Sequence, residues 1–417
     1  IGLQLFHAGA YSMAFKKGQE VVAPSPVPSG LTKQIPRELT LEDIQQLIEN
    51  YVQAALRAKR AGYEVIEIIS SAGYLINQFL SPLTNQRRDK YGGSLENRMR
   101  FGLEVVAAIR QQVGSDMVMS VRLSGHDYVP GSNTWRETSI FAQELQQASV
   151  DLLNITGGWH QSRVPQIQAE VPRGNYVYLA QKIREKVDIP VAIGNRINNP
   201  ALAESILQRG QADLISIARG FLADDQWANK AGSGQAHKIR KCIACATCLD
   251  GVFLEKSHPP GVTCAINAQA GFEETRQIKT PKQQYRVLVI GAGPAGLEAA
   301  WVAACQGHQV VVLEREPHIG GQWRLAAVPP GKEEFYSLIK YYQEVLDELG
   351  VEIKTGIDTT VTDIAAENPD IILVATGALP KMPPIPVDKE AVVMQAWQVL
   401  AGEPVKISPR SRSMEAA

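Results

Sequence analysis

The stretch Tyr285-Arg286-Val287-Leu288-Val289-Ile290-Gly291-Ala292-Gly293-Pro294-Ala295-Gly296 decides the fold of the second half of the chain. An apolar run of strand length passes directly into a G-x-G-x-x-G turn, and the helix-like run Leu297–Cys305 follows. In this setting Gly291 permits a tight turn, Gly293 lets a pyrophosphate approach the backbone, and Gly296 allows close packing of helix on strand. The stretch therefore predicts a dinucleotide-binding unit, and a glycine-rich turn without a ligand is the competing interpretation.

The sequence that follows this turn extends the same prediction. A second strand candidate, Gln309–Leu313, ends in Glu314, whose carboxylate is well placed in sequence to accept hydrogen bonds from a ribose hydroxyl. Two later segments, Gly320-Gly321-Gln322-Trp323 and Ala375-Thr376-Gly377, lie after helix and strand candidates. The chemistry of the glycine turn does not predict a role for these two segments.

Four of the five cysteines crowd together upstream of the glycine turn. Cys242, Cys245 and Cys248 form a C-x₂-C-x₂-C pattern, and Cys264 follows after 15 intervening residues. Four thiolates fit a [4Fe–4S] cluster, a zinc site or a set of unliganded thiols, and three closely spaced cysteines favour the cluster. Cys305 lies in the apolar helix candidate after the turn, where we expect it to be a small core residue.

The first 230 residues alternate between strand and helix patterns, which predicts a parallel α/β sheet. A closed (β/α)₈ barrel needs eight such units, so the six found here leave two missing, and an open doubly wound sheet is the alternative. Thr40 with Asp43 and Ser94 with Asn97 supply capping oxygens for two of the helices. The strand candidates are Leu3–His7, Val65–Ile69, Val118–Leu123, Asp151–Ile155, Val191–Gly194 and Asp213–Ala218, and the helix candidates are 41–61, 95–113, 136–148, 176–187 and 199–209.

Composition narrows the class of protein. The 417 residues allow two or three domains, and 42 Lys plus Arg against 43 Asp plus Glu argue against nucleic acid or an anionic membrane as the main partner. No apolar run is long enough to span a membrane, and we expect a cytoplasmic protein. The chain begins at Ile1 inside a strand-like run and its second α/β region stops short, so we expect further segments on both sides.

The chain resembles the Old Yellow Enzyme superfamily, in the branch that contains bacterial 2,4-dienoyl-CoA reductase, 2-enoate reductase and trimethylamine dehydrogenase. The resemblance covers nearly the whole chain and is greatest to 2,4-dienoyl-CoA reductase. The matching segments are Gln4–Gly9, Gly73–Pro82, Asn85–Ser94, Glu96–Arg98, Val121–Ser124, Gly158–His160, Val171–Gly174, Asn195–Ile197 and Ala218–Asp224. One departure is Ala10, which stands where the family usually has Arg.

The resemblance assigns roles to residues at the strand ends of the barrel. It implies that Tyr74 donates a proton to carbon and that His160 orients the substrate or shares the acid role. It implies that Arg122 stabilises the negative charge of reduced FMN and that Gln4 pairs with the pyrimidine edge of the flavin. It makes Gly194, Arg196, Ala218 and Arg219 the contacts of the FMN phosphate, and Gly321, Gln322, Thr376 and Gly377 additional contacts of FAD. The long polar run Arg87–Arg98 is expected to be structural.

The resemblance also implies a domain plan and a set of cofactors. It places an FMN-binding TIM barrel with strands 3 to 8 at residues 1–235, an iron–sulfur connector at 236–284, and a Rossmann-like FAD-binding domain without its NAD(P) subdomain at 285–417. Cys242, Cys245, Cys248 and Cys264 would hold the [4Fe–4S] cluster. NAD(P)H would supply electrons in the full-length protein, passing through FAD and the cluster to FMN.

The function implied is reduction of an electron-poor C=C bond in an enoyl substrate, an acyl-CoA ester included, which would place the protein in fatty acid β-oxidation. One alternative is an amine dehydrogenase that carries out oxidative N-demethylation and passes electrons to a carrier protein. A second alternative is an inactive, truncated product. Neither the exact substrate, the choice between NADH and NADPH, nor the oligomeric state follows from the sequence.

Overall fold

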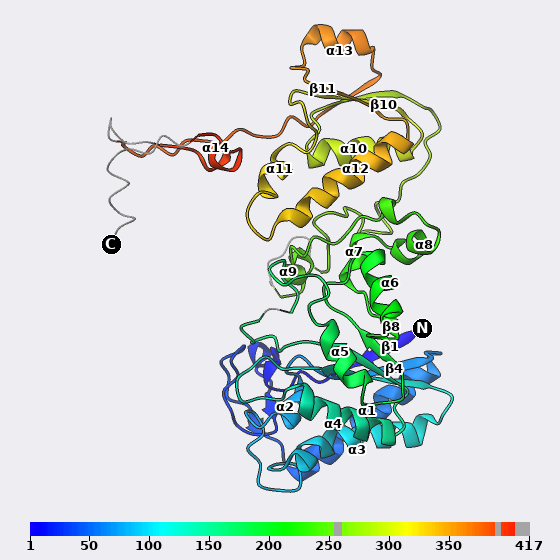
Figure 1. Ribbon diagram of the computed structural model, residues 1–417, viewed down its shortest axis with the longest axis vertical. Coiled ribbons are helices and arrows are strands. Elements are labelled where there is room, and N and C mark those ends of the chain that lie inside the picture. Colours follow the sequence, from blue (N-terminus) through cyan, green and yellow to red (C-terminus); the bar gives the residue numbers. More distant parts are fainter. Residues whose placement is uncertain (165, 254–260, 388–392, 405–417) are drawn as a thin grey trace. The chain divides into compact units, whose positions relative to one another are not determined.

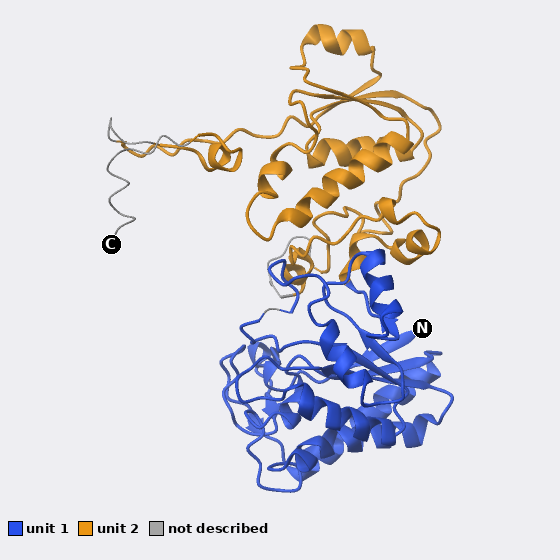
Figure 2. Ribbon diagram, viewed as in Figure 1, with its two compact units in different colours: residues 1–218 blue, residues 219–417 orange. Residues whose placement is uncertain are grey.

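The computed structural model describes residues 1–164, 166–253, 261–387 and 393–404 (Figure 1). The chain forms two compact units, residues 1–218 and residues 219–417 (Figure 2). Each unit has a parallel sheet of its own, with six strands in the first and four in the second. The α/β class predicted from the sequence is therefore confirmed.

Unit 1 holds the six-stranded sheet in the order β1-β4-β5-β6-β7-β8, so each βα unit adds a parallel strand beside the previous one. This is the order of consecutive strands in a TIM barrel. Two very short strands, β2 (Val22–Ala23) and β3 (Arg37–Glu38), form a separate pair before the first long helix. The sheet strands are β1 (Gly2–Leu5), β4 (Val65–Ser70), β5 (Val118–Ser124), β6 (Leu152–Thr156), β7 (Val191–Ile193) and β8 (Leu214–Ile215).

Most of the helices described in unit 1 begin at a residue whose side-chain oxygen caps the helix. Thr40 and Asp43 form a reciprocal capping box at α1, and the Ser94 hydroxyl accepts from the Asn97 amide at α3, as predicted. Pro200 occupies the first turn of α6, where its missing N–H costs nothing. The helices are α1 (Leu41–Arg60), α2 (Leu75–Leu80), α3 (Leu95–Val113), α4 (Trp135–Gln147), α5 (Val177–Arg184) and α6 (Pro200–Gln208), with 3₁₀ turns η1 (Gly9–Tyr11) and η2 (Ala14–Lys17).

Side chains alternate between the two faces of the unit 1 sheet. Apolar residues such as Val121, Leu123 and Ile155 are fully buried. The residues that alternate with them on β5 and β6 include Ser120, Arg122 and Asn154, so one face of the sheet carries a polar row. Helices α1 and α3 pack side by side against the sheet (Figure 1). The polar row lines the inner face expected of a barrel.

Unit 2 begins with short helices, and its four-stranded sheet has the order β11-β10-β9-β12. No helix in the described ranges is both long and apolar enough to cross a membrane. The elements are α7 (Arg219–Ala223), α8 (Trp227–Gly232), η3 (Ala236–Lys238), α9 (Thr247–Phe253), β9 (Arg286–Ile290), α10 (Pro294–Cys305), β10 (Gln309–Glu314), α11 (Gln322–Ala326), η4 (Glu333–Phe335), α12 (Tyr336–Glu348), β11 (Glu352–Thr355), α13 (Val361–Glu367), β12 (Ile371–Val374) and α14 (Ala396–Leu400).

Helices α10 and α12 pack against one another and cover the sheet of unit 2 (Figure 1). The core between them contains Val289, Val312, Leu297 and Leu346, all at most 1 % exposed. The strand Arg286–Ile290 that opens the glycine turn is central, with β10 on one side and β12 on the other. The sequence therefore forms the strand–turn–helix unit that it predicts.

Candidate active site and cofactor sites

Tyr74 and His160 meet at the carboxyl-terminal end of the unit 1 strands. Tyr74 is the N-cap residue of α2, shortly after β4, and His160 follows β6. A bridge between Ala72 and Trp159, with a 3.2 Å hydrogen bond from the His160 amide to the Ala72 carbonyl, ties the two loops together. The His160 Nε2 atom and the Tyr74 hydroxyl lie 2.9 Å apart, within hydrogen-bonding distance. The structure thus brings together the two side chains predicted to be catalytic.

The surroundings of this pair set its protonation state. Burial raises the pKa of the Tyr74 phenol, and the nearby Arg122 guanidinium opposes that rise. Burial lowers the pKa of the His160 imidazole. Near neutral pH the phenol is therefore protonated and the imidazole uncharged. A protonated phenol held by a neutral imidazole can deliver a proton to an atom placed against it.

Aromatic rings surround the pair. The Tyr74 ring lies edge-on to Phe6, with centroids 5.1 Å apart, and to Tyr11, with centroids 6.2 Å apart. The Tyr11 ring also lies edge-on to Trp159 and His160. Tyr11 is 7 % exposed, and its position was not predicted, because nothing in the sequence separates it from an ordinary packed tyrosine. The rings pack around the half-buried Tyr74, and the exposed His160 side chain leaves the pair accessible to solvent.

The polar row of unit 1 offers contacts for a flavin. The Glu67 carboxylate accepts hydrogen bonds from Gln4 at 2.5 Å, Ser120 at 3.0 Å and Asn154 at 2.8 Å, and so holds the Gln4 amide in one orientation. Among the described residues, the side chain of the half-buried Arg122 has no hydrogen-bond or ion-pair partner, and its charge acts on Tyr74. A cation without a protein partner beside an oriented amide fits a flavin that becomes anionic on reduction. Sequence reasoning missed Glu67.

The four predicted phosphate contacts are divided between the units. Gly194 follows β7, and Arg196 adopts a left-handed backbone (φ 57°). The Arg196 guanidinium is buried and donates to the Val171 carbonyl at 2.9 Å, so this side chain fastens the preceding loop. Ala218 ends unit 1 and is exposed. Arg219 begins α7 in unit 2, where it lines a hollow with the four clustered cysteines.

The glycine turn of unit 2 has the shape that a pyrophosphate requires. Gly291 has a φ of 104°, in the region that L side chains rarely adopt. A side chain on Gly296 would collide with the Gly291 carbonyl, so helix and strand approach too closely for any larger residue. At Gly293 an added Cβ would meet nothing within 4 Å, which leaves the backbone open to a ligand at the start of α10. These three features fit a bound dinucleotide.

The other predicted dinucleotide contacts converge on this turn. Glu314 is 7 % exposed, and its carboxylate accepts the Ala292 amide at 2.6 Å, which places it directly beside the glycines. Gly321 lies against Gly293, since a Cβ on Gly321 would come within 3.2 Å of the Gly293 Cα. The Gln322 amide donates to the Ala378 carbonyl at 2.8 Å and so links this segment to the loop that holds Thr376 and Gly377. The structure brings all of these residues together.

The four clustered cysteines line one hollow within unit 2. Ala244 (φ 54°) and Ala246 (φ 63°), which separate the first three, both have left-handed backbones. These two left-handed residues change the direction of the backbone, so that the segment from Cys242 to Cys248 curves around the hollow. Its other lining residues are Arg219, Leu222, Ile243, Ala246, Ala265 and Ile266, so it is largely apolar.

Electrostatic contacts confirm that the cysteine sulfurs are neighbours. Burial raises the pKa of Cys248, and Arg219 lowers it. Burial also raises the pKa of Cys264, whereas hydrogen bonds from the amides of Ile266 and Asn267 lower it. Cys242 and Cys245 contribute to both shifts. Among the described residues, no group of three or more His, Cys, Asp or Glu side chains is arranged to hold a single metal ion.

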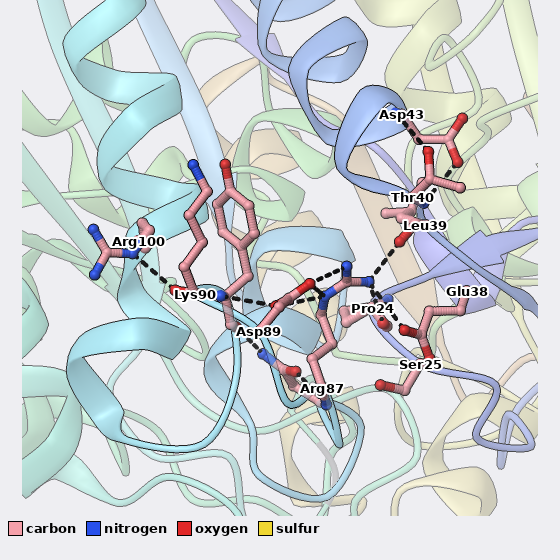
Figure 3. Close-up of polar contacts among 12 residues, drawn as sticks. Pro24, Ser25, Glu38, Leu39, Thr40, Asp43, Arg87, Asp89, Lys90 and Arg100 are labelled. Atoms are coloured by element: carbon pink, nitrogen blue, oxygen red, sulfur yellow. Dashed lines mark hydrogen bonds and ion pairs between the residues drawn. The ribbon is translucent and has the colours of Figure 1, made fainter.

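Arg87 opens the run Arg87–Arg98, which the sequence predicts to be structural, and its guanidinium contacts other parts of unit 1. The buried Arg87 guanidinium donates to the carbonyls of Pro24 at 3.0 Å and Leu39 at 2.5 Å and pairs with the Asp89 carboxylate at 2.6 Å (Figure 3). It therefore clamps the segment before α1 onto the loop before α3. These contacts of the Arg87 guanidinium are all with residues of unit 1.

Residues 1–238, more than half of the chain, match the model of the NADH:flavin oxidoreductase / NADH oxidase family. The chain belongs to this family. A second model, pyridine nucleotide-disulphide oxidoreductase, matches residues 285–399. The chain therefore combines a flavin-oxidoreductase barrel region with a Rossmann-like dinucleotide region that follows it.

Relatives within the family differ in the activity that they are named for. The chain is 49% identical to a metal reductase of Desulforamulus reducens over 96% of its length, and 40% identical to an NADH oxidase of Thermoanaerobacter brockii over 97%. It spans 60% and 62% of the length of these two curated relatives. A solved structure of 2-naphthoyl-CoA reductase with 2-naphthoyl-CoA is 33% identical, with a TM-score of 0.92 over 97% of this chain and 63% of that one.

Proposed function

We propose that the chain is part of a reductase of electron-poor C=C bonds, of the 2,4-dienoyl-CoA or 2-enoate type, supplied with electrons by NAD(P)H. The observation that carries this proposal is the 2.9 Å contact between Tyr74 and His160. A half-buried, protonated phenol suits the step in which a carbon next to the reduced position gains a proton. Similarity to a solved 2-naphthoyl-CoA reductase supports the same class of reaction.

The residues of unit 1 divide the work. Bound FMN, once reduced with electrons from NAD(P)H, would supply a hydride to the electron-poor carbon of the alkene. Tyr74 gives its proton to the neighbouring carbon, and His160 holds the phenol in place and returns a proton to it from solvent. Gln4 would pair with the pyrimidine edge, and Arg122 would face the developing negative charge. Gly194, Arg196 and Ala218, with Arg219, are the proposed contacts of the flavin phosphate.

The cysteine hollow is proposed to hold a [4Fe–4S] cluster. Its support is the C-x₂-C-x₂-C spacing, the shared hollow with Cys264, and the amides of Ile266 and Asn267 directed at that sulfur. Amide donors to cysteine sulfur are among the features that tune such clusters. Bound, the cluster would carry single electrons. We likewise propose FAD as the occupant of the glycine turn, with Gly291, Gly293, Gly296 and Glu314 at its pyrophosphate and ribose.

The test of the reductase proposal is Tyr74→Phe, with Tyr63→Phe, at the opposite end of β4, as the matched control. The protein is loaded with FMN, reduced without oxygen, and mixed with a 2-enoate or a 2,4-dienoyl-CoA while flavin absorbance is followed. We expect alkene-dependent reoxidation in the wild type and the control. It should fall by about 10²–10⁴-fold in Tyr74→Phe, because only the proton donor is lost.

Two results would contradict this proposal. A wild-type protein that binds FMN but is not reoxidised by any of the alkenes excludes C=C reduction. Full activity of Tyr74→Phe excludes Tyr74 as the proton donor.

A second candidate, oxidation of N-methylated amines, is favoured by the aromatic rings around Tyr74. Phe6, Tyr11 and Trp159 lie close to the same centre, and aromatic faces attract cationic amines. The same protein separates the two candidates. Reduction of its oxidised flavin by an N-methylated amine would support the second, whereas reoxidation of its reduced flavin by an enoate supports the first.

A further inference from the structure

Asp127 is a buried carboxylate behind the Tyr74–His160 pair. It lies in the loop after β5, is 0 % exposed, and does not contact either member of the pair. Its Oδ2 accepts the Ser132 hydroxyl at 2.7 Å and the amide and side-chain nitrogens of Asn133 at 3.1 and 3.2 Å. Its Oδ1 accepts the Asn77 side-chain nitrogen at 3.3 Å. Every group directed at the carboxylate is thus a donor.

Two short routes lead from Asp127 to the pair. The Asn77 side chain, which donates to Asp127, accepts the Gly73 amide at 2.9 Å, and Gly73 directly precedes Tyr74. The Asp127 carbonyl accepts the Trp159 amide at 3.1 Å, and Trp159 directly precedes His160. The same residue therefore fixes the backbone on each side of the hydrogen bond that joins the catalytic side chains.

We infer that Asp127 is the positioning residue that holds Tyr74 and His160 at hydrogen-bonding distance, and this rests on the proposed reductase function. The role depends on the negative charge, because four donors converge on one carboxylate. A protonated Asp or an amide would present a hydrogen to groups that are themselves donors. The loop would then shift, and the two catalytic side chains would separate.

The protonation state of the Asp127 carboxylate depends on pH. Burial raises its pKa to about 6, while hydrogen bonds from Ser132, Asn77 and Asn133 pull the pKa down. The carboxylate is therefore ionised at neutral pH and becomes protonated as the pH falls through about 6. The titratable groups on the elements packed around it are Tyr11 of η1, Tyr74 before α2, His126 of the same loop, His160 after β6 and Glu137 of α4.

The test compares Asp127→Asn with Asp116→Asn, an exposed aspartate in the loop before β5. Alkene-dependent reoxidation of the FMN-loaded protein is measured from pH 5 to 8. We expect Asp127→Asn to lower the rate by about 10²-fold at neutral pH with unchanged FMN affinity, because displacement of reacting groups by about 1 Å has that effect. The wild type and Asp116→Asn should lose activity as the pH falls through about 6, and Asp127→Asn should show no such loss.

Ser132→Ala provides a milder variant. It removes one hydrogen bond that lowers the pKa of Asp127, so the acid limb of the wild-type profile should move to higher pH while the neutral rate is retained. Two results would overturn the inference: an acid loss of activity at the same pH in Ser132→Ala as in the wild type, or an acid loss that persists in Asp127→Asn. Either result would assign the group that titrates to His160.

A readout without substrate separates this inference from the function on which it rests. Burial lowers the pKa of the His160 imidazole in the wild type. An NMR titration of the whole chain would follow this pKa. We expect it to rise toward its ordinary value in Asp127→Asn, as the loop opens to water. An unchanged His160 pKa overturns the positioning role, whether or not the protein reduces an alkene. A raised His160 pKa in a protein that reduces no alkene supports positioning and contradicts only the proposed reaction.

Discussion

Backbone conformation distinguishes the clustered cysteines from the fifth cysteine. Ala244 and Ala246 adopt left-handed conformations that cost an L-residue about 1–2 kcal/mol each. Such conformations persist only where the surrounding structure requires them, and they gather at functional sites. Cys305 lies instead in the regular helix α10, outside the hollow, and its exposed side chain shows that the prediction of a core residue was wrong. The strained segment therefore supports the proposal that Cys242, Cys245, Cys248 and Cys264 share one cofactor.

This difference gives a prediction at the scale of single residues. Cys245→Ser and Cys264→Ser should each lower the iron and acid-labile sulfide of the anaerobically reconstituted protein, because each removes one of the four proposed ligands. Cys305→Ser is the matched control and should keep both. The measurement is iron and sulfide per chain, with the electron paramagnetic resonance spectrum of the reduced protein. Full iron and sulfide in either of the first two variants would exclude the cluster from this hollow.

At the scale of elements, the turn between β9 and α10 shows why the three glycines of one motif are not equivalent. Gly291 has a positive φ that disfavours any other residue. Gly296 must lack a side chain because the Gly291 carbonyl lies against it, whereas a side chain at Gly293 would meet only open space. The first two requirements are met by the fold with or without a ligand. Only the third depends on a ligand, since any residue fits at Gly293 until a pyrophosphate approaches.

Gly296→Ala tests the proposal that the turn between β9 and α10 binds FAD. Its Cβ would collide with the Gly291 carbonyl and lie 3.3 Å from the Ala375 Cβ, so α10 must move away from β9. We expect at least tenfold weaker binding of FAD, measured by equilibrium dialysis, because the amides of α10 lose their alignment with the phosphates, a loss of about 1.4 kcal/mol or more. Gly232→Ala in α8 is the control, since its Cβ would meet nothing within 4 Å. Unchanged FAD affinity in Gly296→Ala would show that the nucleotide binds elsewhere.

For the whole molecule, the order of elements was predictable from the sequence, because long periodic runs such as α1 and α3 carry both an apolar stripe and a capping oxygen. Helix α2 was not predicted, because its six residues are all buried and show no polar face. The predicted partners Tyr74 and His160 do meet. The buried Asp127 behind them was not foreseen, since a single aspartate in a loop carries no local signal of burial.

Long-range contacts attach the segment just after residue 235 to unit 2, and the predicted end of the barrel domain at that residue stays a prediction. The division lies between Ala218 and Arg219. Lys238 pairs with Glu348 of α12 at 2.6 Å, and the buried Arg240 lies over the rings of Trp301 and Tyr341. These contacts join residues about 60 to 110 positions apart, beyond the reach of any local pattern, and they attach the segment before the cysteines to helices α10 and α12 of unit 2.

A destabilising substitution in the core of one unit should therefore open that unit and leave the other folded. Leu346 of unit 2 and Phe101 of unit 1 are both 0 % exposed, and the main core cluster of unit 2 contains only residues from 219 onward. Leu346→Ala should remove about 2–5 kcal/mol and Phe101→Ala about 3–5 kcal/mol. Hydrogen exchange read by mass spectrometry should accelerate only within 219–404 for the first variant and only within 1–218 for the second, because local opening follows the element that loses its packing. Faster exchange throughout the chain in either variant would show that both units unfold as one.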